Sequence, residues 1–432
     1  MAKTYDTYKD SGAAWIGEIP SEWKVGLVGR YFDEIKNPNV NQEETNTLQF
    51  KMGNIISKKD GDSKYNPDTI EAYNIVEPDT IMINGLNLSF DLISQRVAQV
   101  QEKGVITSTY LALKPTKGMK SDYAKYLLKA YDNNKALHAM GRGLRATLSY
   151  GTFRSEPVLV PSDNEQQSIA TFLDKKCSEI DSLISLQEEM ISELQAYKQS
   201  VITEAVTKGL DPYAKMKDSG VEWIGEIPEG WRTQKLRTLG WTQNGISQSG
   251  DYFGEEYPYP FISYSDVYKN NSVPYPTGRA NSSEDDRERF SLIEGDVLFT
   301  RTSETIEEIG FASTCMETIP DVVYSGFLIR FRPTSNKLFK GFSKYYFRSQ
   351  IHRAYFVKEM NLVTRASLSQ DLLKNLIVLL PSIETQKDIA NYLDNKTQQI
   401  DTIISLKQQK IAELKDYKKS IIYEYVTGKK RV

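Results

Sequence analysis

Apolar residues recur at heptad spacing in two segments of the chain, one before its midpoint and one at its end. One heptad position is held by Leu173, Ile180, Leu194 and Val201 in the first segment, and by Leu393, Ile400, Leu414 and Ile421 in the second. Further apolar residues follow three positions later, namely Leu183, Met190, Tyr197, Ile403 and Tyr417. Neither segment contains an interior proline or glycine. The pattern predicts two long helices, each with an apolar seam.

A polar residue interrupts both seams at the same central heptad position, as Gln187 in one and Lys407 in the other. Such residues fix register and orientation at a cost in stability. We expect the two helices to pack on each other as an antiparallel coiled coil, because a tandem repeat that closes on itself acquires a pseudo-two-fold axis. The alternative is that each helix covers its own domain separately.

The residues that precede each of these segments alternate short apolar runs with turn residues. "VEPDTIMIN" from Val76 and "IEGDVLFTR" from Ile293 each place a turn before a short strand. "GVITSTYLALKP" from Gly104 and "VVYSGFLIRFRP" from Val322 are β-rich runs that end at proline. A helical pattern follows each of them. Strands and helices together predict a mixed α+β fold.

The two halves of the chain repeat one another. "DSGAAWIGEIPSEW" from Asp10 returns as "DSGVEWIGEIPEGW" from Asp218, and the helical segments match at an offset of 220 residues. This predicts two similar domains in tandem with a pseudo-two-fold axis, separated by the two helices. The expected boundaries are 1–160 for the first domain, 161–209 for the central helix, 210–380 for the second domain and 381–432 for the distal helix.

Composition narrows the class of protein. The chain has 432 residues, 39% hydrophobic and 26% charged, with a formal net charge of −3 and no apolar run long enough to span a membrane. Cys177 and Cys315 lie far apart and fit neither a disulfide framework nor a metal motif. We expect a cytoplasmic protein without a metal site.

The sequence offers little for catalysis. The two histidines, His138 and His352, do not correspond between the halves, and there is no nucleotide-phosphate loop and no nucleophile elbow. The acidic run "SSEDDRERF" from Ser282 has the composition of a solvated loop. We therefore expect a noncatalytic chain.

Positive charge is concentrated in one matching block of each half. Residues 103–155 hold ten Lys or Arg and two acids, and residues 323–375 hold the same numbers. The first helical segment is acidic by contrast. Two such blocks suit contact with DNA phosphates. The alternative is that these lysines are ordinary surface residues of solvent-exposed helices.

Polar loops within and beside these blocks are the candidate DNA-reading segments. They are "NGLNLS" from Asn84, "GRGLRATLS" from Gly141, "TRTSE" from Thr300 and "TRASLS" from Thr364. Their side chains suit phosphates or base edges. The candidate DNA-binding residues are Asn84, Asn87, Arg142, Arg145, Thr147, Arg301, Thr302, Ser303, Arg365 and Ser367.

These motifs resemble the DNA-specificity subunits of type I restriction–modification systems. The resemblance rests on "DSGxxWIGEIPxxW" at the head of each half, on "RATLS" and "RASLS", and on "LVPSDNEQQSIATFLD" and "LLPSIETQKDIANYLD" before the long helices. It implies two target-recognition domains, each reading one half of a split, asymmetric DNA site. One departure from the family pattern is "IMINGLNLS", where the second half has the arginine-bearing "LFTRTSE".

The resemblance also implies partners and cofactors. Two modification (methyltransferase) subunits would bind the helical region, and restriction (motor and nuclease) subunits would complete the enzyme. S-adenosylmethionine, ATP and Mg would then belong to those partners, with no cofactor in this chain. A coiled-coil scaffold that binds only protein is the alternative function.

Overall fold

A computed structural model describes residues 4–58, 70–89, 95–141, 146–248, 252–302, 309–360 and 367–432, with side chains at 353, 354 and 358–360 excepted. The chain divides into two compact units. Unit 1 comprises residues 1–188 and 408–432, and unit 2 comprises residues 189–407. None of the helices in the described ranges is long and apolar enough to cross a membrane.

The two long helices are α6 (Asp163–Lys208) and α12 (Ile383–Val426). Acidic residues lie in the first turn of both, where they oppose the positive end of the helix dipole. Gly209, with φ +79°, follows α6 directly, and Gly428, with φ +69°, lies two residues beyond α12. Each helix contributes one half to unit 1 and the other half to unit 2.

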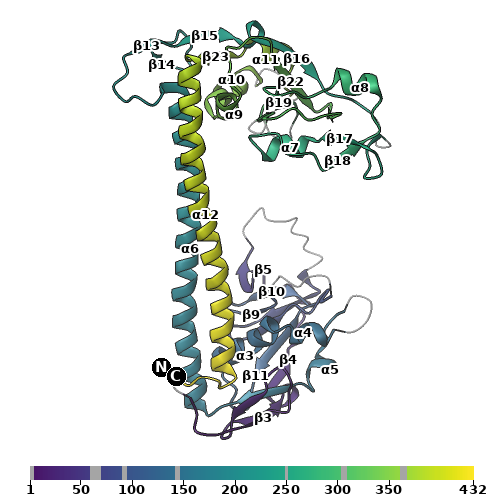
Figure 1. Ribbon diagram of the computed structural model, residues 1–432. Helices are drawn as coiled ribbons and strands as arrows, with labels where there is room; N and C mark the ends of the chain where they lie inside the picture. Colours follow the sequence, from purple (N-terminus) through teal and green to yellow (C-terminus); the bar gives the residue numbers. More distant parts are fainter. Residues whose placement is uncertain are drawn as a thin grey trace. The chain divides into compact units, whose positions relative to one another are not determined.

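Within each unit, the two helix segments run antiparallel (Figure 1). In unit 1, the ring of Phe172 lies 4.4 Å from that of Tyr425, and further along α6 Asp181 pairs with the earlier residue Lys418. In unit 2, Met190 contacts Lys407, and further along α6 Lys198 pairs with Asp401. The expected antiparallel packing of the helices is confirmed within both units.

The residues three positions on from the seam are exposed rather than buried, although Met190 contacts Lys407 of the other helix. The side chains of Leu183, Met190, Tyr197, Ile403 and Tyr417 are 37–55% exposed. Residues four positions on are buried instead, as Cys177 and Thr397 show. Cys177 interacts with Tyr126 of helix α3 (Ser121–Asn133), and the Thr397 hydroxyl lies 3.2 Å from that of Tyr345 in helix α9 (Lys340–Tyr346). The buried stripe turns toward this side because each helix half packs on its own domain as well as on the other helix.

A four-stranded antiparallel sheet is the common framework of the two domains. Its strand order is β4-β11-β8-β9 in unit 1 and β16-β22-β19-β20 in unit 2. The strands are β4 (Phe32–Glu34), β11 (Leu111–Pro115), β8 (Ile81–Ile83), β9 (Val97–Gln99), β16 (Gly240–Asn244), β22 (Leu328–Pro333), β19 (Val297–Thr300) and β20 (Ala312–Thr314). Helix α3 (Ser121–Asn133) packs against β9, and α9 (Lys340–Tyr346) packs against β20.

Two smaller pairings also occur in both units. They are the hairpins β1 (Tyr8–Asp10) with β2 (Glu18–Pro20) and β13 (Met216–Asp218) with β14 (Glu226–Pro228), and the pairs β3 (Lys24–Leu27) with β12 (Pro157–Val160) and β15 (Arg232–Lys235) with β23 (Ile377–Leu380). The mixed α+β class and the internal duplication are therefore confirmed.

The remaining strands differ between the units. Unit 1 has two antiparallel pairs, the hairpin of β5 (Leu48–Lys51) with β6 (Asn54–Ser57) and the pair of β7 (Tyr73–Val76) with β10 (Gly104–Thr107). Unit 2 has a three-stranded sheet of β18 (Gly278–Ala280), β17 (Tyr259–Ile262) and β21 (Val323–Tyr324). One framework thus carries two different additions.

Short helices complete both units. They are α1 (Val28–Tyr31), α4 (Ala136–Ala139) and α5 (Tyr150–Phe153) in unit 1, and η1 (Leu236–Thr238), α7 (Tyr264–Lys269), α8 (Glu284–Arg289), α10 (Ile351–Met360) and α11 (Gln370–Asn375) in unit 2.

A buried glutamine ties each domain to the start of its helix. The side-chain amide of Gln166 donates to the carbonyls of Gly118 and Pro161 and accepts from the Lys120 N–H. Gln386 repeats all three bonds in unit 2, with Lys337, Pro381 and Phe339 as its partners. Because each amide is fully bonded in a buried position, the helix start and the domain are held together in a fixed geometry.

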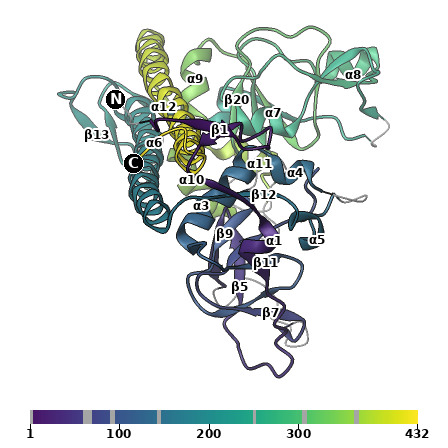
Figure 2. The ribbon, with the colours of Figure 1, turned by 90° about the horizontal axis from the view of Figure 1, so that it is seen from below.

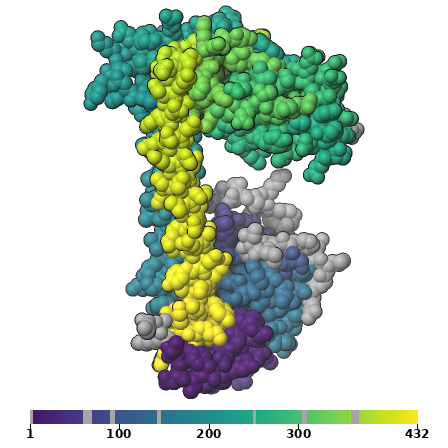
Figure 3. Space-filling model, viewed as in Figure 1, coloured from purple at the N-terminus to yellow at the C-terminus, as the bar shows by residue number. Residues whose placement is uncertain are grey.

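The repeated opening phrase fastens the end of a long helix. In unit 1, the Tyr423 hydroxyl near the end of α12 donates to the carbonyls of Trp15 and Ile16. Figures 2 and 3 show the N-terminal residues beside these last turns of α12. In unit 2, the buried Trp231 approaches Gly209 at the end of α6. The phrase occurs twice because there are two helix ends to hold.

Candidate nucleic-acid interface

Two loops meet at one end of the four-stranded sheet in each domain. In unit 1, the Leu148 N–H donates to the Gly85 carbonyl at 2.9 Å, and the Leu88 N–H donates to the Ala146 carbonyl at 3.1 Å. In unit 2, the Leu368 N–H donates to the Arg301 carbonyl at 2.8 Å. We call residues 84–89 with 146–149 the first loop pair, and residues 301–302 with 367–369 the second loop pair.

Strand register shows which residues of the two loop pairs correspond. Ile83 pairs with Leu111, and Phe299 pairs with Ile329 at the matching place in the other sheet. Gly85 and Arg301 each stand two residues beyond these pairs. A Cβ atom on Gly85 would lie 2.9 Å from the Cβ of Leu148, so the first loop pair has no room for a side chain there. The second carries a half-buried arginine at the same place.

The described candidate residues of the first loop pair differ in accessibility. Asn84 is half-buried, and its side-chain oxygen accepts the Leu86 N–H at 3.2 Å. Asn87 is exposed and has φ +51°, a left-handed conformation that asparagine tolerates better than most residues. Thr147 is half-buried beside Ala146, which has φ +42°. Asn87 is therefore the residue of this group that is open to a ligand.

The second loop pair brings together Thr302 and Ser367, which form an antiparallel bridge, and Arg301; all three are half-buried. Arg142, Arg145, Ser303 and Arg365 lie outside the described residues. For all ten candidates, contact with DNA remains a prediction.

Two residues near the loop pairs were missed from the sequence. Phe327 is 61% exposed, and its carbonyl accepts the Arg301 N–H at 2.9 Å. Arg96 is 1% exposed, and its guanidinium lies among the carbonyls of the first loop pair. A loop phenylalanine and an arginine before a short strand carry no distinguishing pattern in a single sequence.

Charge counting overstated the free positive charge of the two blocks. Lys125 and Lys344 each lie 2.7 Å from a helix carboxylate, that of Asp174 and Asp394 respectively. Arg332 pairs at 2.6 Å with the buried Asp296. Other cations of the blocks donate to carbonyls, as Arg330 and Arg348 do. Exposed cations remain in the described part of the first block, among them Lys114, Lys117, Lys120 and Arg154.

Cys177, Cys315 and His352 have structural surroundings rather than catalytic ones. Both cysteines are free and buried, and burial raises the pKa of Cys177 and brings that of Cys315 to about 12. Both thiols are thus held in the unreactive protonated form. His352 is buried, with Nε2 3.0 Å from the Tyr346 carbonyl. In the described ranges, no group of three or more His, Cys, Asp or Glu could hold a metal ion.

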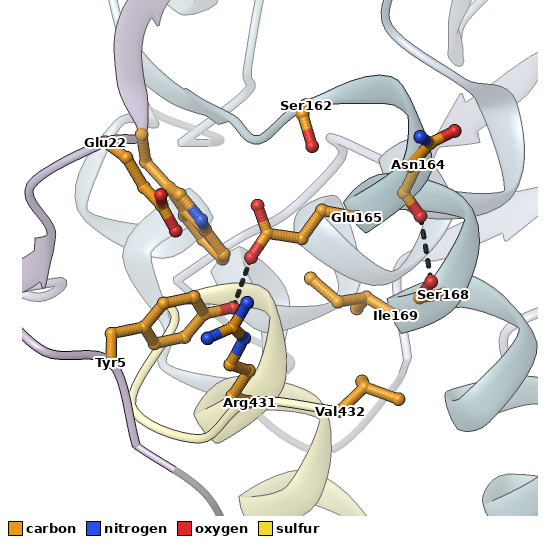
Figure 4. A pocket seen from close by; sticks show the side chains of 10 residues that line it. Tyr5, Glu22, Ser162, Asn164, Glu165, Ser168, Ile169, Arg431 and Val432 are labelled. Atoms are coloured by element: carbon orange, nitrogen blue, oxygen red, sulfur yellow. Dashed lines mark hydrogen bonds between the residues drawn. The ribbon is translucent and has the colours of Figure 1, made fainter.

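A pocket of about 390 Å³ in unit 1 lies where the N-terminal segment meets the start of α6 (Figure 4). The Tyr5 hydroxyl points at Glu165 and donates to it at 2.5 Å, and the Arg431 guanidinium lies 5.4 Å from the Tyr5 ring centre. Burial and the adjacent carboxylate raise the pKa of Tyr5. The polar groups that line this pocket contact one another, and the bond from Tyr5 to Glu165 fastens the N-terminal segment to the start of α6.

The fold and the loop pairs define an internally duplicated protein with two loop-bearing domains and paired helices. The profile of the type I restriction modification DNA specificity domain matches residues 228–416. The chain is 25% identical over 430 residues to the specificity subunit of the type I restriction enzyme MjaVIII of Methanocaldococcus jannaschii, covering 96% of this chain and 94% of that one. It is 23% identical over 325 residues to the EcoKI specificity subunit of Escherichia coli K12, covering 73% and 67%.

Solved structures show the same fold. A chain from a study of complex assembly and conformational transition of the type I R-M system matches with a TM-score of 0.70 at 15% identity, covering 94% of this chain and 98% of that one. The HsdS subunit from Thermoanaerobacter tengcongensis matches with a TM-score of 0.51 at 17% identity, covering 99% and 100%. The chain is therefore similar to type I restriction specificity subunits along most of its length, and it shares the fold of solved HsdS-type chains.

Proposed function

We propose that this chain reads a split, asymmetric DNA site, one half with each loop pair, and directs methylation or cleavage of that DNA by partner subunits. The observation that carries the proposal is the relation between Gly85 and Arg301. They occupy the same place in two copies of one framework, yet they present different chemistry. Two such surfaces on one chain suit two different half-sites, because side chains and loop shape decide which base edges are read.

In this proposal the chain itself is noncatalytic. Two modification subunits bind the helical region, and restriction subunits join them. Buried, protonated thiols and a buried histidine with a carbonyl partner support a reading role rather than a chemical one. S-adenosylmethionine, ATP and Mg would be bound by the partners.

Mapping of methylated adenines tests the proposal. DNA from cells that express the modification subunits with this chain is compared with DNA from cells that express the modification subunits alone. We expect methylation only when the chain is present, at one asymmetric motif with two specified parts and an unspecified gap. Methylation that is independent of the chain, or lacks a motif, would support a protein scaffold instead.

The gap should depend on the helices. Seven residues inserted in α6 next to Gln187 and seven in α12 next to Lys407 preserve the heptad seams and lengthen each helix by about 10 Å. We expect the same two half-sites with a longer gap. Insertion of seven residues in α6 alone serves as the matched control, because it breaks the pairing of the two seams and should lower methylation. An unchanged gap in the double insertion would mean that the helices do not set the spacing.

A further inference from the structure

The first loop pair is built around a buried arginine. Nη1 of Arg96 lies 3.0 Å from the carbonyl oxygen of Asn84 and 2.7 Å from that of Leu86, and Nη2 lies 3.5 Å from that of Asn87. The Arg96 side chain is 1% exposed. One guanidinium thus hydrogen-bonds three carbonyls of a loop whose other face is open to solvent.

The arginine is itself fixed by the domain core. Its backbone N–H donates at 2.6 Å to the carboxylate of Asp132, which is buried near the end of α3. The Asn84 N–H donates to the Arg96 carbonyl at 2.8 Å, which joins the loop to the start of β9. A planar guanidinium can hold several acceptors in one geometry, which an ammonium group cannot do equally well.

The second domain has a different residue at the place of Arg96. By strand register Val97 corresponds to Ala312, so the residue at the place of Arg96 is Phe311, which packs against Arg348 and Tyr268. There the arginine of the loop pair is Arg301, on the loop itself. Each domain therefore has an arginine at its loop pair, but at different positions of the fold: Arg96 precedes β9 and supports the loop from below, whereas Arg301 lies on the loop itself.

The backbone position of Asn87 depends on its contact with Arg96. Its carbonyl faces the guanidinium, its backbone is left-handed with φ +51°, and its side chain is exposed. The next residue, Leu88, is bonded to Ala146 of the neighbouring loop. A change in the support beneath the loop would move the Asn87 amide, and an asparagine amide is a side chain that reads a base edge, most often that of adenine.

We propose that Arg96 is a positioning residue for DNA reading: it holds the first loop pair so that Asn87 contacts one base pair of one half-site. This rests on the proposed function. Arg96 does not touch DNA, and its effect is carried by the loop carbonyls. Loss of its donors leaves those carbonyls without their partner, so the loop relaxes to another conformation.

The test uses the full chain in complex with its modification subunits. Methylation rates are measured on a DNA library in which each base pair of both half-sites is varied. Arg96→Lys keeps the charge but loses the planar fork, and Asn87→Ala removes the exposed amide without touching the buried arginine. We expect both variants to relax preference at the same single base pair, by about tenfold, with the other half-site unchanged.

Arg330→Met is the matched control. Arg330 is also a fully buried arginine, bonded to the Ser291 carbonyl and the Gln243 side chain, but it lies in the second domain. The Arg330→Met variant should keep the base preferences of the half-site that the first domain reads. Thermal unfolding of each complex separates loss of fold from loss of reading.

The outcomes distinguish this inference from the proposed function. Relaxation at one shared base pair supports it. An unchanged profile for Arg96→Lys, an equal fall on all sequences, or relaxation at a different base pair from Asn87→Ala would overturn it. A wild-type complex without sequence preference would overturn the proposed function itself.

Discussion

The ammonium group of Lys198 on α6 lies 2.7 Å from the carboxylate of Asp401 on α12. The same pair recurs in unit 1, where Lys418 on α12 lies 2.6 Å from Asp181 on α6. Each lysine stands 220 residues from its counterpart, and so does each aspartate. The lysine side chains are about one quarter exposed, and the aspartates more than half. The ion pairs therefore repeat with the duplication and join the two helices in both units.

These two ion pairs should contribute equally, and only weakly, to the free energy of unfolding. Because the carboxylates are solvated, we expect a coupling energy of about 0.2–1 kcal/mol for each pair. A double-mutant cycle with Lys198→Ala and Asp401→Ala measures it by urea unfolding, and the cycle with Lys418 and Asp181 is the internal control. A coupling above about 2 kcal/mol in one unit alone would contradict the equivalence of the two pairs.

Gly85 should tolerate no side chain. A Cβ atom there would meet the Cβ of Leu148 at 2.9 Å and its carbonyl oxygen at 3.1 Å, so Gly85→Ala must push the two loops apart. We expect a loss of about 1–3 kcal/mol in unfolding free energy and weaker reading of one half-site. Gly151→Ala is the control, because its nearest neighbour would be a hydroxyl at 3.8 Å. Equal stability of the two variants would show that the loops are not held together.

The half-buried ammonium of Lys129 should make stability depend on pH. Burial, and then the nearby Lys418 and Lys125, lower its pKa from 10.5 to about 8, against a smaller opposing effect of Cys177 and Asp181. Between about pH 8 and 10 the unfolded chain binds this proton more tightly than the folded one. The penalty is complete below pH 8, so stability should rise with pH across that window.

Lys129→Met removes this charge. We expect a gain of about 1–3 kcal/mol at pH 7 and a smaller rise in stability between pH 8 and 9.5. Urea unfolding at several pH values measures both. An unchanged slope would show that Lys129 is not the group responsible.

The long helices and the duplication could be predicted because they leave regular signals. Heptad spacing marked Leu173, Ile180, Leu393 and Ile400, and all four are buried. Val201 and Ile421 are also buried, whereas Leu194 and Leu414 are half-buried. The second stripe of each seam was misplaced because the sequence does not show on which side of the helix the domain packs. Residues such as Cys177 and Thr397 are buried by Tyr126 and Tyr345, which come from distant parts of the chain.

The meeting of the loops was only partly predictable. Loop composition indicated four candidate DNA-reading segments, and the structure brings Gly85 to Leu148 and Arg301 to Leu368. The role of Arg96 depends on the position of three carbonyls, which no sequence pattern reports. The charge count of the second basic block also overstated its free positive charge, because Arg332 is neutralised by a carboxylate 36 residues away in sequence.

The claim that each domain reads its own half-site is tested most directly by one comparison. The methylated motif is determined in parallel for complexes that carry Arg145→Ala or Arg365→Ala, two candidate contacts in corresponding loops of the two halves. We predict that each variant loses preference in one half-site, a different one for each, and keeps it in the other, at a cost of about 1–3 kcal/mol per lost base contact. If both variants weaken both half-sites to the same extent, the division of reading between the two domains is contradicted.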